Sequence, residues 1–252
     1  MPEMDALAPD LAGGELALLA LAVFVAGMVR GFSGFGTAMV YLPVAGQVLP
    51  PFEALTTLIV MDLIGPLPNI PAALRQGATG DLAWLLAGTL AGLPLGVWGL
   101  SLVPPEVFRY GVSLVSLVLL VLLVAGVRYR GATGPGLLAG TGLISGGLAG
   151  AVGLPGPPVI LFYMASPYPA RVIRATIMLF LIASDVLMLG VLGAKGFLVA
   201  QAVVLGLVLA VPYMLGNLAG AGIFRPGAEA AYRRLALLII AVSALSGLPL
   251  FD

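Results

Sequence analysis

The stretch Gly150-Ala151-Val152-Gly153-Leu154-Pro155-Gly156-Pro157-Pro158 decides how this chain folds, because it interrupts an apolar run in which a membrane helix would otherwise continue. Its three prolines remove backbone donors and fix φ, while Gly153 and Gly156 permit φ values that other residues avoid. One helix must therefore end here. Another can begin, because proline is favoured at the first helical position.

A second glycine-rich break, Gly31-Phe32-Ser33-Gly34-Phe35-Gly36, lies in the first third of the chain and is again surrounded by apolar residues. A shift of 119 residues superposes several landmarks of the two halves, namely Gly27 on Gly146, Gly31 on Gly150, Gly34 on Gly153, Pro50 on Pro169 and Thr57 on Thr176. The sequence therefore predicts that each half carries one broken membrane helix.

Composition places the chain in the membrane. Of the 252 residues, 61% are apolar and 9% are charged, whereas soluble domains average about 45–50% and about 25%. The zero net charge argues against nucleic acid as a partner. The absence of cysteine and histidine excludes disulfides, thiolate chemistry, haem ligation and the usual zinc sites, so we predict neither a metal nor a cofactor. Residues 1–15 hold four acids and no base, which is untypical of a signal peptide.

Each half reads as a hairpin around its break followed by three longer apolar runs. In the first half these are Leu16–Val29 and Thr37–Leu49, then Phe52–Leu74, Leu82–Val103 and Val107–Val127. In the second half they are Gly136–Ala149 and Val159–Ala165, then Val172–Leu192, Phe197–Ile223 and Tyr232–Leu248. The flanking arms are short for a full crossing, which takes about 20 residues. We therefore predict a repeat at 1–130 with its hairpin at 16–49, and a repeat at 131–252 with its hairpin at 136–166.

Charge in the loops indicates the topology. If each broken segment re-enters and leaves on one side, one face collects eight basic residues against two acidic ones, and the other face holds seven acids against Arg109 and Lys195. This asymmetry fits the positive-inside rule with both termini outside a bacterial inner membrane. A single crossing at each break would instead distribute the basic loops over both faces of the membrane. Two short full crossings give the same parity and stay an alternative.

An odd number of crossings follows each hairpin, so the two halves would have opposite orientations. The predicted fold class is thus an all-α polytopic membrane protein with two inverted repeats, the recurrent plan of secondary transporters. Non-helical backbone at membrane depth persists only where protein or water satisfies it. We therefore expect the two breaks to approach each other and to line a polar pocket.

Arg30, directly before the first break, is the leading candidate for a functional residue. A buried arginine stays protonated and requires an anionic or carbonyl partner. One interpretation is a structural ion pair, and the other is recognition of a substrate anion by the planar guanidinium. The helix starts near Thr37 and Pro158 would add free N–H groups and positive dipole ends, which favours the second interpretation.

Asp62 and Asp185 are the only acids in the middle of apolar spans. Either could neutralise Arg30, bind a proton or help to hold a sodium ion, because an intramembrane carboxylate is a functional candidate by default. A fixed ion pair without a role in turnover is the competing interpretation. Arg174 and Glu53 lie within about a turn of their helix starts, where snorkelling to the interface is expected.

We expect the substrate to contact both breaks through hydroxyl and backbone groups. The predicted binding residues are Arg30, Gly31, Ser33, Gly34, Gly36 and Thr37 at the first break and Gly153, Leu154, Gly156 and Pro157 at the second. Weaker polar candidates, which commonly join membrane helices, are Thr57, Thr176, Tyr41, Asn69, Tyr213 and Asn217. The spacings Gly92–Gly96–Gly99 and Gly216–Gly220 predict close helix packing.

These motifs resemble the TauE/SafE sulfite-exporter family. The resemblance is carried by Gly27-Met28-Val29-Arg30-Gly31-Phe32-Ser33-Gly34-Phe35-Gly36 and by 146–158, with Pro43, Pro50 and Thr57, then Pro169 and Thr176, downstream. It covers nearly the whole chain and implies export, sometimes import, of small sulfur-containing anions. The run of three glycines usual in the family is reduced here to Gly34-Phe35-Gly36-Thr37, which alters the pocket where the substrate should sit.

The leading hypothesis is a secondary transporter that exports sulfite, thiosulfate or an organosulfonate by alternating access, with a proton or sodium ion as coupling ion. The alternatives are an anion channel, or a transporter of another small organic anion such as a carboxylate. An intramembrane enzyme is disfavoured, because the chain lacks histidine and cysteine and has no loop large enough for an active site. The expected partners are the anion and the lipid bilayer, and a homodimer is left open.

Overall fold

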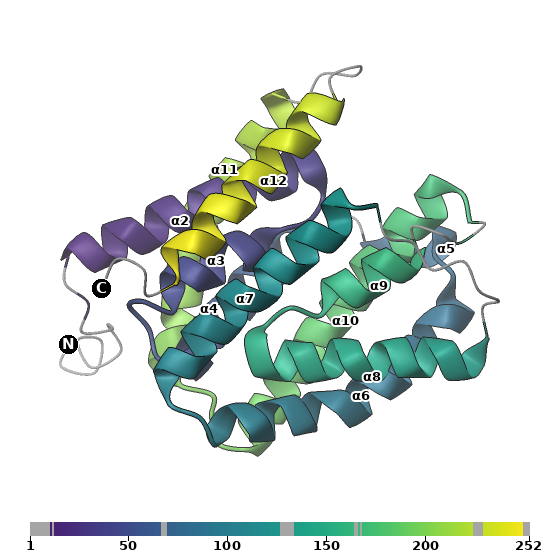
Figure 1. The fold of residues 1–252 in the computed structure, drawn as a ribbon, viewed down its shortest axis with the longest axis horizontal. Helices are drawn as coiled ribbons and strands as arrows, with labels where there is room; N and C mark the ends of the chain where they lie inside the picture. Colours follow the sequence, from purple (N-terminus) through teal and green to yellow (C-terminus); the bar gives the residue numbers. More distant parts are fainter. Residues whose placement is uncertain are drawn as a thin grey trace. The chain divides into compact units, whose positions relative to one another are not determined.

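The computed structural model describes residues 11, 13–66, 70–126, 134–163, 166, 168–223 and 229–248. In these ranges the chain forms helices and no strand (Figure 1). The helices are α2 (Gly13–Ser33), α3 (Thr37–Ala45), α4 (Pro51–Ile64), α5 (Ile70–Gln76), α6 (Thr79–Ser101), α7 (Pro105–Val124), α8 (Pro135–Val152), α9 (Gly156–Tyr163), α10 (Ala170–Ala194), α11 (Ala200–Ile223) and α12 (Glu229–Ser246).

Six of these helices are long and apolar enough to cross a membrane, namely α2, α6, α7, α8, α10 and α11. They leave large apolar side chains exposed, such as Leu95 at 62% and Leu218 at 68%, as expected where hydrocarbon takes the place of water. The chain is therefore an all-α, multi-pass membrane protein, which confirms the predicted class.

Both predicted helix breaks are present. The first lies between α2 and α3, where Gly36 has a φ of 101° directly before α3. The second lies between α8 and α9, where Gly153 has a φ of 70° directly after α8. A side chain at such φ values would approach the backbone too closely, so glycine permits each chain reversal.

Three predicted boundaries differ from the structure. The first arms, α2 and α8, are not short but long enough to cross, because no proline interrupts 13–33 or 136–152. The predicted single span Phe52–Leu74 contains two helices, since α4 ends at Ile64 and α5 begins at Ile70. Pro66 accounts for the interruption, because it lacks the N–H that would bond the carbonyl of Asp62.

Several predicted features lie outside the described residues. These are the acidic N-terminal residues up to Asp10, the candidate Asn69, the basic loop around Arg128 and Arg130, the basic residue Arg225, and Asp252 at the C-terminus. The predicted positions of both termini relative to the membrane thus stay predictions.

The chain divides into two compact units that do not follow the halves of the sequence. Unit 1 comprises 1–64, 104–120 and 196–252, and unit 2 comprises 65–103 and 121–195. Each unit therefore contains helices from both predicted repeats. The repeat boundary near residue 130 describes sequence symmetry rather than compactness, and it stays a prediction.

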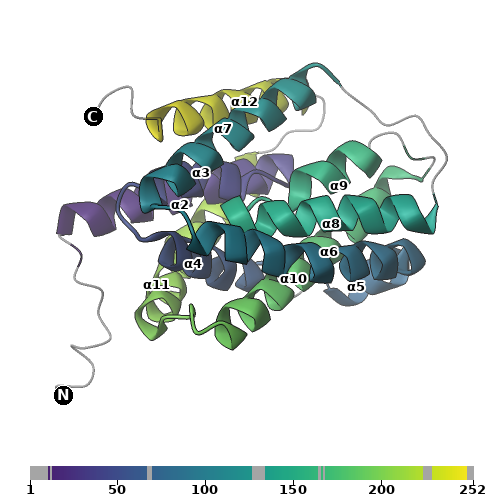
Figure 2. The same ribbon diagram turned by 60° about the horizontal axis from the view of Figure 1, so that its bottom comes forward.

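In unit 1, α2 and α11 run side by side and in parallel with their backbones in contact (Figures 1 and 2). A Cβ atom on Gly27 would lie 2.3 Å from the carbonyl oxygen of Tyr213, and one on Gly31 would lie 2.3 Å from that of Asn217. From the other side, Gly216 approaches the carbonyl of Phe24 in the same way. Only glycine permits this spacing.

Unit 2 contains a helix pair of the same kind, formed by α6 and α8. A Cβ atom on Gly146 would lie 2.4 Å from the carbonyl oxygen of Thr89, and one on Gly92 would lie 2.1 Å from that of Leu143. Close packing is confirmed for the predicted glycines except Gly99, which has open space around it. Gly27 and Gly31 correspond to Gly146 and Gly150 under the shift of 119 residues. In each unit, the first arm of one half thus packs on a long helix of the other.

Candidate functional site

Four polar side chains of unit 1 lie together at the first helix break. Arg30 lies in the last turn of α2 and Thr37 is the first residue of α3. Asp62 comes from α4 and Tyr213 from α11. The break brings Arg30 and Thr37 together, and the contacts of α11 with α2 and α4 bring the other two to them.

An ion pair forms the centre of this cluster. Arg30 Nη1 lies 2.8 Å from Asp62 Oδ2, and both side chains are 14% exposed. The same nitrogen donates to Thr37 Oγ1 at 3.3 Å. Of the two interpretations of Arg30, the structure therefore contains the ion pair, and Asp62 is its acidic member. Buried charges of this kind persist only when paired and hydrogen-bonded.

Tyr213 closes the cluster into a ring. Its hydroxyl donates to Asp62 Oδ1, and it lies 3.3 Å from Thr37 Oγ1. Both oxygens of Asp62 are thus occupied, one by a guanidinium and one by a phenol. We call Arg30, Thr37, Asp62 and Tyr213 the polar ring.

The sequence predicts for Tyr213 only a role in joining helices, but its position in the chain also indicates a polar partner. Tyr213 is close to the middle of α11, which runs from Ala200 to Ile223, and it is fully buried. A phenol at mid-membrane depth needs a hydrogen-bond acceptor, and Asp62 is the one acid in unit 1 at such a place in an apolar run.

The other predicted residues of the first break shape the backbone in this structure. Ser33 Oγ lies 2.6 Å from the carbonyl oxygen of Val29 and 2.8 Å from that of Phe35, so it holds the end of α2. Gly31 packs against the backbone of Asn217, and Gly36 directly precedes α3. Gly34 is exposed, with a φ of 81°. Their contact with a substrate stays a prediction.

The second break belongs to unit 2 and is apolar at the corresponding places. The shift of 119 residues relates Arg30, Thr37 and Asp62 to Ala149, Gly156 and Leu181. A Cβ atom on Gly156 would lie 3.3 Å from the side chain of Leu181, so these two equivalents are neighbours, as Thr37 and Asp62 are in the polar ring. The second break therefore lacks polar side chains at the positions equivalent to Arg30, Thr37 and Asp62.

The remaining predicted site residues also lie in unit 2. Gly153 ends α8, Leu154 is 2% exposed, and Pro157 is buried in the first turn of α9. Asp185 is partly buried on α10. The structure thus places Asp62 in the polar ring of unit 1 and Asp185 in unit 2. The approach of the two breaks to each other stays a prediction.

The weaker polar candidates join neighbouring segments, as expected. The hydroxyls of Tyr41 and Thr57 lie 2.8 Å apart and link α3 to α4. Thr176 Oγ1 accepts a hydrogen bond of 2.8 Å from the backbone N–H of Ala78. Among the described residues, no group of three or more acidic, histidine or cysteine side chains could hold a metal ion.

The family can be assigned from residues 19–247, which match the family described as "Sulfite exporter TauE/SafE". The match contains both helix breaks, the whole polar ring and all six helices long enough to cross a membrane, apart from the first turns of α2. Comparisons with curated proteins and with solved structures found no match. The chain, with its apolar spans and broken helices, therefore belongs to the sulfite exporter TauE/SafE family of membrane transporters.

Proposed function

We propose that this protein is a secondary transporter that exports a small sulfur-containing anion, such as sulfite, thiosulfate or an organosulfonate, by alternating access across a bacterial inner membrane. The family supplies the transporter class. The observation that carries the site is the partly buried guanidinium of Arg30, which pairs with Asp62 at the first helix break.

In this proposal Asp62 occupies the place of the substrate when the site is empty. A carboxylate and a sulfonate both offer a pair of oxygens that fits the guanidinium fork. An entering anion therefore competes with Asp62 for Arg30. Thr37 supports this exchange, because its hydroxyl already contacts Arg30 and because α3 begins there with unbonded N–H groups.

The same competition provides a route to ion coupling. Once an anion binds Arg30, the charge of Asp62 loses its partner in a region of low dielectric constant, where an unpaired carboxylate is costly. A proton or a sodium ion on Asp62 would neutralise it. Tyr213 keeps the carboxylate in place through Oδ1 during the exchange. Asp185 remains the second candidate for a coupling role.

The experiment that tests the proposal measures anion binding to purified Arg30 variants. Charged hydrogen bonds contribute about 1.5–3 kcal/mol, so Arg30→Ala should weaken binding roughly ten- to a hundredfold. Arg30→Lys keeps the charge without the planar fork, so its anion affinity should fall between those of the wild type and Arg30→Ala. Arg234→Ala serves as the control, because Arg234 is an exposed arginine of α12 in the same unit.

The ligands are sulfite, thiosulfate and isethionate, titrated while intrinsic fluorescence and melting temperature are recorded. A stable Arg30→Ala protein that binds its anion as tightly as the wild type would end the proposal. If Arg30→Ala only lowers the melting temperature, and Arg30→Ala/Asp62→Ala restores it without a change in affinity, the ion pair is structural.

A further inference from the structure

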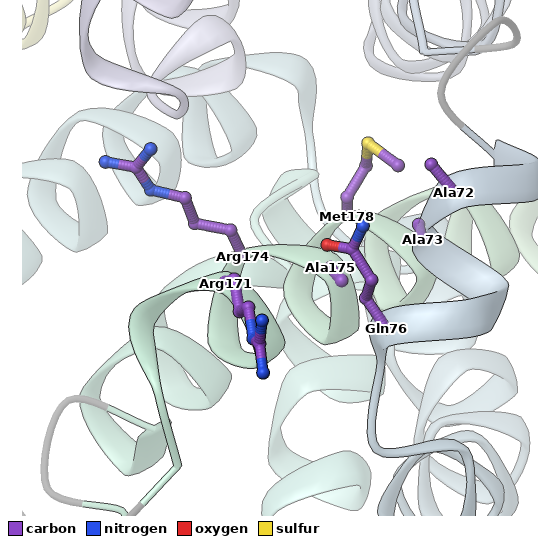
Figure 3. A pocket seen from close by; sticks show the side chains of 7 residues that line it. All are labelled: Ala72, Ala73, Gln76, Arg171, Arg174, Ala175 and Met178. Atoms are coloured by element: carbon purple, nitrogen blue, oxygen red, sulfur yellow. The ribbon is translucent and has the colours of Figure 1, made fainter.

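A second charged site belongs to unit 2, whereas the polar ring belongs to unit 1. Helices α5 and α10 border an open cavity of about 430 Å³ (Figure 3). Its apolar floor consists of three alanines and Met178, and its polar rim consists of Arg171, Arg174 and Gln76. None of the lining residues is acidic. The sequence analysis assigned Arg174 only to snorkelling, and the proposed transport mechanism uses none of these side chains.

The two arginines of the rim carry exposed positive charge. Arg171 and Arg174 lie three residues apart, at the N-terminal end of α10, and both are exposed. Within the described part of the chain, neither guanidinium forms an ion pair with a carboxylate. Backbone N–H groups without helical partners add positive potential at the same end of α10. The rim therefore attracts an anion.

The depth of the site selects the kind of anion. The apolar span of α10, Arg171–Ala194, contains 24 residues. At 1.5 Å per residue it is about 36 Å long, which exceeds the hydrocarbon thickness of about 30 Å. Arg171 and Arg174 thus lie at the level of the lipid headgroups, with the apolar floor of the cavity directly beside them.

We propose that this cavity binds the phosphate headgroup of an anionic phospholipid. The arginine rim matches the phosphate, and the floor of alanines and Met178 matches the glycerol and upper acyl region. A free, hydrated anion would gain nothing from that floor. In Figure 3 the two arginine side chains leave α10 in different directions. Exposed side chains change rotamer within nanoseconds, so both can turn to one headgroup.

The predicted topology agrees with this assignment. Arg171 and Arg174 belong to the basic face that the positive-inside rule places in the cytoplasm. Anionic lipids are abundant in the cytoplasmic leaflet, and basic pockets between membrane helices bind their headgroups. A lipid bound here would contact both α5 and α10 and so stabilise unit 2. The inference needs only a membrane-spanning chain and does not depend on the transported substrate.

The test compares lipid binding by the purified full-length chain and by a double variant, Arg171→Gln/Arg174→Gln. The probes are palmitoyl-oleoyl phosphatidylglycerol and the corresponding phosphatidylcholine in mixed micelles, with bound lipid counted by native mass spectrometry and the melting temperature recorded. The matched control is Arg75→Gln/Arg234→Gln, which removes two exposed arginines that do not line the cavity.

We expect phosphatidylglycerol to remain bound to the wild type and to the control, and its apparent affinity to fall at least tenfold in the cavity variant. Phosphatidylcholine should bind weakly to all three. Equal phosphatidylglycerol affinity in wild type and cavity variant would overturn the proposal. If inorganic phosphate alone, at millimolar concentration, displaces the lipid and raises the melting temperature equally, the site takes a free anion and the lipid assignment falls.

Two further variants keep the outcome decisive. The single variants Arg171→Gln and Arg174→Gln cover the case in which the double variant does not fold. Each should lose part of the phosphatidylglycerol affinity.

Discussion

At the scale of the residue, Asp62 is the partner of Arg30 and, in the proposed mechanism, also the competitor of the substrate. Its two oxygens accept from Arg30 and from Tyr213. The sequence singled out Arg30 and Asp62 as candidates, because a charge inside an apolar run has few tolerated explanations. It singled out Thr37 because this residue flanks the first break. It undervalued Tyr213, since the contact with Asp62 joins residues 151 positions apart. The local pattern indicates that a phenol at this depth needs an acceptor, but it does not indicate which distant residue supplies it.

Asp62→Asn should bind the transported anion more tightly than the wild type. The substitution removes the negative charge that occupies Arg30 and keeps the shape of the side chain. A gain of about 1.4 kcal/mol would appear as a tenfold lower Kd. The same variant should lose uptake driven by a proton or sodium gradient in proteoliposomes, while exchange of substrate persists.

Asp185→Asn should be measured beside it under the same gradients. If both variants bind and accumulate the anion as the wild type does, the two acids are structural and the coupling model is wrong.

Tyr213→Phe should destabilise the protein, because it removes the donor to Asp62 Oδ1 and leaves that oxygen buried with one partner fewer. The expected loss is about 1–3 kcal/mol of unfolding free energy, visible as a lower melting temperature. Tyr232→Phe is the control, since the Tyr232 hydroxyl donates to the exposed end of α11 at the carbonyl of Ile223. Equal melting temperatures for the two variants would contradict the closed polar ring.

At the scale of the element, the two glycine-lined helix pairs decide the packing of both units. The sequence indicated close packing through glycine spacing, but it did not indicate which helices would meet. The helices that meet come from opposite halves of the chain, as α6 and α8 do. The length of the first arms was also underestimated, because residues beyond the apolar core of α2 and α8 continue the helix.

Gly146→Ala and Gly147→Ala should have opposite effects, although they are adjacent on α8. A Cβ atom at Gly146 would come 2.4 Å from the carbonyl oxygen of Thr89, whereas one at Gly147 would meet nothing within 4 Å. We expect Gly146→Ala to lower the free energy of unfolding by about 1–3 kcal/mol, because the added methyl group overpacks the helix contact. Gly147→Ala should raise it by up to about 1 kcal/mol, because alanine favours the helix more than glycine does. Melting curves in one detergent decide this, and similar melting temperatures would refute the close approach of α6 and α8.

At the scale of the whole molecule, the sequence predicted an all-helical membrane protein with two broken helices, and the structure confirms both. It did not predict that each compact unit would draw helices from both halves. Composition and periodicity describe neighbours along the chain, whereas the division into units depends on contacts between distant helices. The repeated glycine pairs support the sequence repeat, and the opposite orientation of the two repeats stays a prediction.

The topology can be tested with single cysteines, since the chain contains none. Cysteines at positions Asp10, Tyr129 and Asp252 are labelled in intact cells with a membrane-impermeant thiol reagent. We expect positions 10 and 252 to react from outside and position 129 to react only after permeabilisation. The reverse pattern would exclude the predicted orientation and, with it, the cytoplasmic location of the arginine-rimmed cavity.

The order of synthesis determines when Arg30 can meet each residue of the polar ring. Arg30 and Asp62 are 32 positions apart, whereas Tyr213 follows Asp62 by 151 positions. At about 5–20 residues per second, a ribosome delivers Asp62 within roughly 2–6 seconds of Arg30 but needs about 8–30 seconds more for Tyr213. The nascent chain thus has a counter-ion for its arginine long before α11 exists. We therefore expect Asp62 to neutralise Arg30 early in membrane insertion, before Tyr213 is synthesised.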